Sequence, residues 1–451
     1  MRIIIVGCGK IGMTIIKQLS NEGHDITVID TNSQKVHSAS DTYDVLGFVG
    51  NGASHGVQIE AGIERADMLI AVTGSDELNI LCCLIAKKAG NCNTIARVRN
   101  PVYNEEIKFI KDELGLSLTI NPEYEAAMEI AKILRLPSAI KVDTFAKGKV
   151  ELLKYKITKD SQLQDISLIE IQTKYKTDVL VCAVERDNKV LIPRGDFRFH
   201  QGDVIHMIAS HINIIKLFKA IGIESKRVQT ATIVGGGIIT YYLAKELNKI
   251  GIKVKIIETN LEKCEQLSEL FPEAIIINAD ATNQEVLIEE GIDNAESFIS
   301  LTGIDEANIF LSLFAQSRSK AKVITKINRI SYDDIIHAFD LGSIIYPKYI
   351  TADHIVRFVR ATQNSMGSNV ETLYKIIEGK AEALEFVIKE KFDFVGKKIE
   401  ELNIHEDAII ASIQHNGKII IPRGQDVINV NDHVIVVTTA TGISDIKDIL
   451  G

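Results

Sequence analysis

Short runs of apolar and β-branched residues alternate along the chain with segments whose apolar residues recur every three or four positions. Over residues 1–123 the short runs lie at Ile3–Val6, Ile26–Ile29, Val45–Val49, Met68–Val72 and Thr94–Val98. Buried strands that alternate with amphipathic helices are typical of a parallel sheet covered by helices on both faces. We therefore predict a Rossmann-like, doubly wound α/β domain in this part of the chain.

The chain also contains a long internal repeat. The segment that starts at Ile3, IIIVGCGKIGMTIIKQLSNEGHDITVID, resembles the segment that starts at Thr232, TIVGGGIITYYLAKELNKIGIKVKIIE. Likewise, KVLIPRGDFRFHQGDVIHMIA from Lys189 resembles KIIIPRGQDVINVNDHVIVVT from Lys418. Each half therefore holds two modules, and we place the first to fourth modules at residues 1–123, 140–224, 230–348 and 368–451.

The second and fourth modules follow a different pattern. Short apolar runs flank Arg186–Asn188 in the second module and Asn416-Gly417 in the fourth, which predicts a β-hairpin in each. A helical segment that begins after a proline, Glu123–Leu136 or Lys348–Arg360, precedes each module. We predict small α+β domains with antiparallel strands. Their IPRG turns fit either a hairpin with proline at a sheet edge or a contact with a small ligand or another subunit.

Composition and charge narrow the class of protein. Hydrophobic residues make up 46% of the 451 and charged residues 25%, which excludes a disordered or fibrous chain. The net charge of −9 disfavours a nucleic-acid partner. No apolar run approaches the roughly 20 residues of a bilayer-spanning helix, and the start lacks a signal-peptide pattern. We expect a cytoplasmic protein without membrane insertion, whose six cysteines are free thiols that bind no metal.

A glycine-rich motif, Gly7-Cys8-Gly9-Lys10-Ile11-Gly12, lies between the first predicted strand and helix. Its glycines permit a tight turn, a close approach of backbone N–H groups to a pyrophosphate, and close packing of helix on strand. Asp30, at the end of the next strand, can accept hydrogen bonds from a ribose diol and would repel a 2′-phosphate. NAD(H) is favoured over NADP(H), and ATP, ADP and AMP fit this half of the site equally well.

The third module carries a second copy of the motif, Gly235-Gly236-Gly237-Ile238-Ile239-Thr240, followed by Glu258 at the ribose position. Thr240 replaces the third glycine, so we expect the helix to lie further from the strand. The second copy is either another nucleotide site or only a structural joint between strand and helix.

Further candidates follow the other strands of the first module: Asn51, Thr73, Gly74, Glu77 and Arg97. Ligands bind at the carboxyl ends of the strands in such sheets. Arg97 and Arg99 lie two residues apart and therefore on one face, where either can neutralise phosphate. The alternative is that an arginine caps an edge of the sheet or pairs with Asp67 or Glu77.

Enzyme classes receive little support from the motifs. Gly52–Gly56 matches the G-x-S-x-G nucleophile elbow around Ser54, but the third module keeps only Thr282, which can cap the following helix. No G-x-x-x-x-G-K-[ST] loop or H-E-x-x-H motif occurs. We expect a nucleotide-binding protein with no catalytic residues. The alternatives are a soluble NAD(H)-dependent oxidoreductase and a redox-sensing transcription regulator, and no basic recognition helix supports the latter.

The whole chain resembles the TrkA family, the cytosolic regulatory subunits of bacterial Trk potassium uptake systems. The resemblance rests on the tandem order of the modules and on GCGKIG, AVTGSDELN, IARVRNP and the paired IPRG hairpins. It implies regulator-of-potassium-conductance (RCK) N-domains in the first and third modules and C-domains in the second and fourth. It also implies a homo-oligomer, a dimer that presents four N-domains.

The resemblance further implies a peripheral protein on the inner face of the cell membrane, where it gates a TrkH-like integral membrane potassium transporter when NAD(H) or ATP/ADP binds. By the family's pattern, Gly7–Ile11, Asp30, Thr73-Gly74 and Arg97 contact the nucleotide. The second-site equivalents are Gly235–Ile239, Glu258 and Thr302-Gly303.

Overall fold

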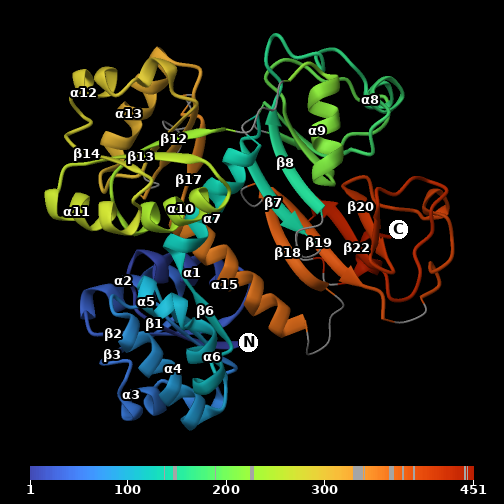
Figure 1. Ribbon diagram of the computed structural model, residues 1–451. Coiled ribbons are helices and arrows are strands. Elements are labelled where there is room, and N and C mark those ends of the chain that lie inside the picture. The colour runs from blue at the N-terminus through green and yellow to red at the C-terminus, as the bar shows by residue number, and fades with distance from the viewer. Residues whose placement is uncertain are drawn as a thin grey trace. The chain divides into compact units, whose positions relative to one another are not determined.

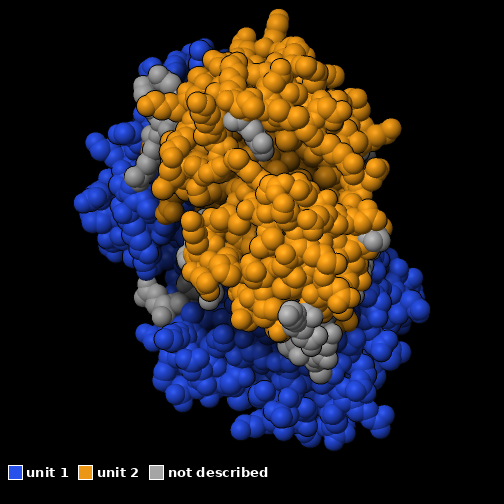
Figure 2. All heavy atoms as spheres, turned by 90° about the vertical axis from the view of Figure 1, so that its right-hand side faces the viewer, with its two compact units in different colours: residues 1–131, 229–358 blue, residues 132–228, 359–451 orange. Residues whose placement is uncertain are grey.

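The chain divides into two compact units in a computed structural model (Figure 2). The structure describes every residue except 137, 146–149, 188, 224–227, 329–338, 340, 365–369, 378–379, 390–391, 441–442, 444 and 451. One unit holds residues 1–131 and 229–358, and the other holds residues 132–228 and 359–451. The first and third modules therefore share one unit, and the second and fourth modules share the other.

The first module is built on a parallel sheet that has six strands in the described residues, in the order β3-β2-β1-β4-β5-β6. The strands are β1 (Arg2–Val6), β2 (Asp25–Asp30), β3 (Leu46–Val49), β4 (Met68–Ala71), β5 (Asn93–Arg97) and β6 (Leu118–Ile120). The helices are α1 (Lys10–Ser20), α2 (Ser33–Tyr43), α3 (His55–Glu60), the 3-10 helix η1 (Ile63–Arg65), α4 (Asp76–Gly90), α5 (Pro101–Glu105), α6 (Ile107–Leu114) and α7 (Pro122–Arg135). The order reverses between β1 and β4, the position where such sheets bind ligands.

Helices cover both faces of this sheet, with α1 and α2 on one side and α3 and α4 on the other (Figure 1). The central strand β1 is accordingly apolar at successive positions, and Ile3, Ile4, Ile5 and Val6 are each at most 2% exposed. Burial on both faces explains why the sequence shows a continuous apolar run there and no alternation.

The third module repeats this architecture with the order β14-β13-β12-β15-β16-β17. Its described strands are β12 (Thr230–Val234), β13 (Lys253–Glu258), β14 (Ile275–Asn278), β15 (Ser297–Ser300), β16 (Lys322–Lys326) and β17 (Ser343–Ile345). Its described helices are α10 (Ile238–Lys249), α11 (Leu261–Leu270), α12 (Gln284–Glu289), η3 (Ile292–Asn294), α13 (Asp305–Arg318) and α15 (Pro347–Asn364). Two Rossmann-like domains are thus confirmed.

The second and fourth modules contain antiparallel sheets, ordered β10-β9-β11-β8-β7 and β18-β19-β22-β20-β21 among the described residues. The second module has β7 (Lys141–Phe145), β8 (Val150–Lys156), α8 (Leu168–Tyr175), β9 (Leu180–Arg186), β10 (Lys189–Leu191), β11 (Val204–Ala209) and α9 (His211–Ala220). The fourth has β18 (Val370–Ile377), β19 (Ala381–Val387), η4 (Ile399–Glu401), β20 (Ala408–His415), β21 (Lys418–Ile420), β22 (His433–Thr438) and η5 (Ile446–Ile449). Both hairpins are confirmed, although the predicted turn residue Asn188 lies outside the described residues.

The two antiparallel sheets share a hydrophobic core. One cluster contains Leu152 and Ile208 of the second module together with Ala383, Ile435 and Val437 of the fourth. The arginines of the IPRG turns each pair with an acidic residue of the other module: Arg194 lies 3.6 Å from Glu406, and Arg423 lies 3.5 Å from Asp178. These four side chains are exposed, so the pairs contribute little stability. The apolar cluster is therefore the main stabilising contact between the two sheets.

No helix in the described parts of the chain is both long enough and apolar enough to cross a lipid bilayer.

Candidate functional site

The glycine loop of the first module forms a tight joint between β1 and α1. Gly7 adopts φ +105°, a backbone conformation that disfavours other residues. A Cβ on Gly12 would lie 1.9 Å from the carbonyl oxygen of Gly7, whereas a Cβ on Gly9 would meet no atom within 4 Å. The third glycine therefore permits close packing, as the motif predicts, and the middle glycine leaves open space above the loop.

The start of α1 differs from the starts of the next three α-helices of the module, α2, α3 and α4. Side chains of Asn32, Ser54 and Ser75 accept hydrogen bonds from the first turns of α2, α3 and α4. Gly9, the N-cap of α1, has no side chain to do so. The first N–H groups of α1 thus lack an intrahelical or side-chain partner, and the helix dipole adds partial positive charge there. This is a suitable place for a phosphate.

Asp30 is oriented by the backbone on both sides of it. One carboxylate oxygen accepts a hydrogen bond from the Cys8 N–H at 2.7 Å, and the other accepts one from the Asn32 N–H at 2.9 Å. A carboxylate has about four acceptor positions, so each oxygen retains one for a ligand hydroxyl. The geometry fits the predicted recognition of a ribose diol.

A cavity of about 790 Å³ lies over this loop, at the carboxyl ends of the strands. It brings together nine of the residues predicted for the first site: Gly7, Gly9, Lys10, Ile11, Asp30, Asn51, Thr73, Gly74 and Arg97. Three other predicted residues, Cys8, Gly12 and Glu77, do not line it. Its volume is in the range of sites that hold a small-molecule cofactor.

Sequence reasoning missed several residues that line the cavity. Lys35 comes from the first turn of α2 and Glu123 from the first turn of α7, and no motif marks either. Asn328 and Lys348 come from the third module, which belongs to the same compact unit. Both residues are more than two hundred positions away from the glycine loop in the sequence, so no local pattern could associate them with it.

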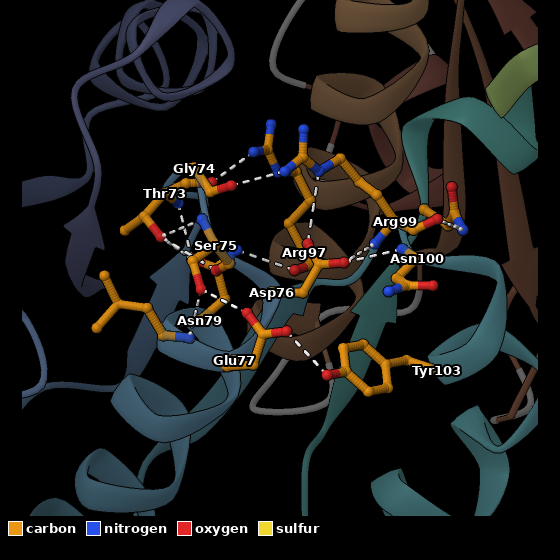
Figure 3. Close-up of polar contacts among 12 residues, drawn as sticks. Thr73, Gly74, Ser75, Asp76, Glu77, Asn79, Arg97, Arg99, Asn100 and Tyr103 are labelled. Atoms are coloured by element: carbon orange, nitrogen blue, oxygen red, sulfur yellow. Dashed lines mark hydrogen bonds and ion pairs between the residues drawn. The ribbon is translucent and has the colours of Figure 1, made fainter. Parts of the chain in front are cut away.

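The loop after β4 is held by the arginines at the end of β5 (Figure 3). Arg97 donates from Nη2 to the carbonyl oxygen of Thr73, and Arg99 donates from Nη2 to that of Gly74 at 2.6 Å. The acidic partner of Arg99 is Asp76, at 3.4 Å, so the alternative partners considered from the sequence, Asp67 and Glu77, were wrong.

Glu77 is engaged by neighbouring side chains and does not line the cavity. Its two carboxylate oxygens accept hydrogen bonds from the hydroxyls of Ser75 at 2.7 Å and Tyr103 at 2.8 Å. The Ser75 hydrogen bond is the main cause that lowers the pKa of Glu77. The side chain points toward these partners in Figure 3.

Arg97 and Glu123 bring opposite charges to the cavity. Burial lowers the pKa of Arg97 and raises that of Glu123. Within the described residues, neither the buried Nε of Arg97 nor the buried Oε2 of Glu123 has a hydrogen-bond partner. Buried polar atoms are rarely left in this state, so both are available to a polar ligand.

The third module reproduces part of this arrangement. Glu258 accepts hydrogen bonds from the N–H groups of Gly236 at 2.6 Å and Asn260 at 2.8 Å, as Asp30 does in the first module. The buried Thr240 donates its hydroxyl to the carbonyl oxygen of Gly235. A Cβ at the matching Gly12 would lie 1.9 Å from the carbonyl oxygen of Gly7, so the third module makes this joint with a threonine hydrogen bond in place of close packing on a glycine.

The residues predicted for the second site are Gly235, Gly236, Gly237, Ile238, Ile239, Glu258, Thr302 and Gly303, and close contacts join Gly235 to Thr302 and Gly236 to Glu258. None of them lines the cavity of the first module. A Cβ on Gly235 would lie 3.0 Å from the backbone nitrogen of Thr302, so the glycine loop and the loop after β15 are adjacent here as well.

The nucleophile-elbow motif has a structural explanation. The Ser54 hydroxyl accepts a hydrogen bond from the Val57 N–H and caps α3. In the third module the cap is Asn283, and Thr282 instead donates its hydroxyl to Asp280 at 2.7 Å. The prediction that Thr282 caps this helix was therefore wrong, because the adjacent asparagine takes that position.

Family models match most of the chain. The TrkA-N domain matches residues 3–122 and 231–347, and the TrkA-C domain matches residues 152–222 and 383–451. The match recurs in both halves, in agreement with the repeat.

Full-length relatives and solved structures agree with these matches. The Trk system potassium uptake protein TrkA homolog of Archaeoglobus fulgidus is 32% identical over 449 residues, which cover 100% of both chains. Trk system potassium uptake protein TrkA homolog 1 of Methanosarcina mazei is 31% identical and covers 99% of both. The solved structure "GsuK channel bound to NAD" has a TM-score of 0.63 and 17% identity, covers 97% of this chain and 77% of that chain, and shows the same fold. The chain belongs to the TrkA family of Trk system potassium uptake proteins.

Proposed function

We propose that this chain is a regulatory subunit that binds NAD(H) or ATP/ADP in the first module and thereby gates an integral membrane potassium transporter. The observation that carries the proposal is the cavity in which an oriented Asp30, an uncapped α1 and Arg97 converge. Membership of the TrkA family supports the link to potassium uptake.

Each end of the cavity suits a different part of such a ligand. The free acceptor positions of Asp30 suit the adenosine ribose. The N–H groups at the start of α1, with Lys10 beside them, suit the phosphates. Arg97, whose buried Nε has no partner among the described residues, suits the phosphates as well, and Glu123 retains an unpartnered oxygen for the remainder of the ligand.

The choice between NAD(H) and NADP(H) depends on the surroundings of Asp30. Its negative charge disfavours a 2′-phosphate. Lys35 lines the same cavity and carries the opposite charge, so NADPH belongs among the ligands compared. We propose that the carboxylate dominates, because two backbone N–H groups hold it in place.

The proposal extends to assembly and location. We infer a homo-oligomer, a dimer with four N-domains, that docks on the cytoplasmic face of a TrkH-like membrane subunit. Nucleotide occupancy then acts as a signal and not as the start of a reaction. A regulator of this kind requires only that the nucleotide bind two conformations with different affinities.

Calorimetric titration with NADH, NAD, ATP, ADP and NADPH tests the binding step. We expect the wild-type chain to bind the ligands without a 2′-phosphate at submicromolar to micromolar concentration. Asp30→Asn should weaken binding at least about tenfold, because a charged acceptor for the ribose is lost. Asp25→Asn, at the opposite end of the same strand, is the matched control and should leave the affinity for each nucleotide unchanged. Absence of binding, or equal losses in both variants, would contradict the proposal.

Turnover would contradict the regulatory role. A fall in NADH absorbance when the chain is mixed with a panel of carbonyl acceptors would support the oxidoreductase alternative, and we expect none.

A further inference from the structure

Asn79 is a fully buried amide beside the candidate site, with 0% of its surface exposed. It lies on the first turns of α4, and its side-chain oxygen accepts hydrogen bonds from both the N–H and the hydroxyl of Thr73, each at 2.7 Å. Its side-chain nitrogen donates to the carbonyl oxygen of Arg97 at 2.9 Å. One side chain thus joins the end of β4 to the end of β5.

These contacts close into a ring through the arginine (Figure 3). Arg97 donates from Nη2 to the carbonyl oxygen of Thr73, the residue that Asn79 holds. The N–H and hydroxyl of Thr73 are therefore used within the protein, and its carbonyl fixes one nitrogen of the guanidinium. The Nε of Arg97 remains buried without a partner in the described residues.

The same ring of contacts recurs in the third module. Asn308, also 0% exposed, accepts from the N–H of Thr302 at 2.9 Å and from its hydroxyl at 2.7 Å, and donates to the carbonyl oxygen of Lys326 at 3.0 Å. Two contacts differ. Asn308 also donates to the carbonyl oxygen of Thr302 at 3.2 Å, and Lys326, which replaces the arginine, donates to the carbonyl oxygen of Leu301 at 3.1 Å. The asparagine therefore fixes the strand ends in both halves, and the cation beside it varies.

We propose that Asn79 is a positioning residue that holds Thr73 and, through it, directs the guanidinium of Arg97 toward the phosphates of the nucleotide. This role rests on the function proposed above. Asn79 does not line the cavity and touches no ligand itself. Its effect should therefore be confined to the part of the ligand that meets Arg97.

A comparison of ADP with adenosine isolates that effect. Calorimetry on the full chain should show that Asn79→Ala weakens ADP binding about tenfold. Adenosine, which lacks phosphates and depends on Asp30, should lose less than about twofold. Ser117→Ala is the matched control, since Ser117 makes the corresponding link to the N–H of Thr94 at the amino end of β5. We expect it to leave both affinities unchanged.

A double variant tests whether the effect passes through the arginine. In an Arg97→Ala background, Asn79→Ala should produce no further loss of ADP affinity, because the group that it positions is absent. Additive losses would overturn the proposal, as would equal losses for ADP and adenosine. If Asn79→Ala does not fold, the milder Asn79→Ser is judged by the same criteria. If the wild-type chain binds NADH but not ADP, NADH takes the place of ADP in the comparison with adenosine. Absence of binding of both nucleotides would instead overturn the proposed function, and this role with it.

Discussion

At the scale of single residues, local motifs identified much of the candidate site. Gly7, Gly9 and Asp30 lie within one strand, helix and strand, so their proximity follows from local geometry. Asn79 and Lys348 could not be assigned in this way. The first contacts Thr73 in the loop after β4 and a backbone carbonyl of β5, and the second lines the cavity from the other half of the chain.

The glycines of the first loop lead to contrasting predictions. Gly12→Ala should destabilise the first module by about 1–3 kcal/mol, because its Cβ would overlap backbone that cannot move aside. Gly9→Ala should cost less, at most about 1 kcal/mol, since its Cβ meets open space and only a glycine N-cap is lost. Urea unfolding of the two variants measures the difference. Equal stabilities would show that the close approach of α1 to the loop has no energetic consequence.

At the scale of elements, the sequence predicted where strands occur better than it predicted which strands pair with one another. The hairpins β9–β10 and β20–β21 carry turn signals, and both form. The central strand β11 pairs with β8 on one side and β9 on the other. Such pairing depends on residues tens of positions apart, for which no local signal exists.

That pairing creates a partly buried ionic cluster. Glu185 on β9 lies 2.7 Å from His206 on β11 and 2.8 Å from Lys154 on β8. Burial alone would raise the pKa of Glu185, but the hydrogen bond from His206 and the charge of Lys154 lower it to about 2. Burial lowers the pKa of His206, so the imidazole donates to Glu185 as a neutral group.

The lowered pKa of Glu185 predicts acid sensitivity in the second module. A carboxylate with a depressed pKa stabilises the fold above its unfolded pKa, and that stability is lost as the pH falls from about 4.5 to about 2. Glu185→Gln should reduce stability at neutral pH by up to roughly 3 kcal/mol. The stability of the variant should also change less with pH between about 4.5 and about 2. Hydrogen exchange of the backbone amides in β8, β9 and β11 at a series of pH values measures this loss of stability. If the variant loses stability with falling pH as the wild-type chain does, Glu185 is not the source of the acid sensitivity.

At the scale of the whole molecule, the repeat predicted four modules but not their grouping. Each compact unit combines a module from each half of the chain. In the unit of antiparallel sheets, alternating residues of β8 serve different cores. Leu152 packs in the cluster shared with the fourth module, and Leu153 packs in the core of the second module alone.

These neighbouring leucines allow a matched test of the shared core. Leu152→Ala and Leu153→Ala should each cost about 2–5 kcal/mol, since both side chains are buried. Leu152→Ala should accelerate hydrogen exchange in β19 and β22 of the fourth module as well as in the second. Leu153→Ala should accelerate hydrogen exchange in the second module alone. The same exchange pattern in both variants would mean that the two sheets are not energetically coupled.

The measurement that tests the central claim most directly is potassium flux through the Trk membrane subunit, reconstituted in liposomes with this chain, at rising NADH and ADP concentrations. The account predicts that nucleotide changes the flux over the concentration range in which it binds. The Asp30→Asn chain should still associate with the membrane subunit but give a flux that nucleotide does not alter. A flux that stays constant while the wild-type chain becomes saturated with nucleotide would contradict the account.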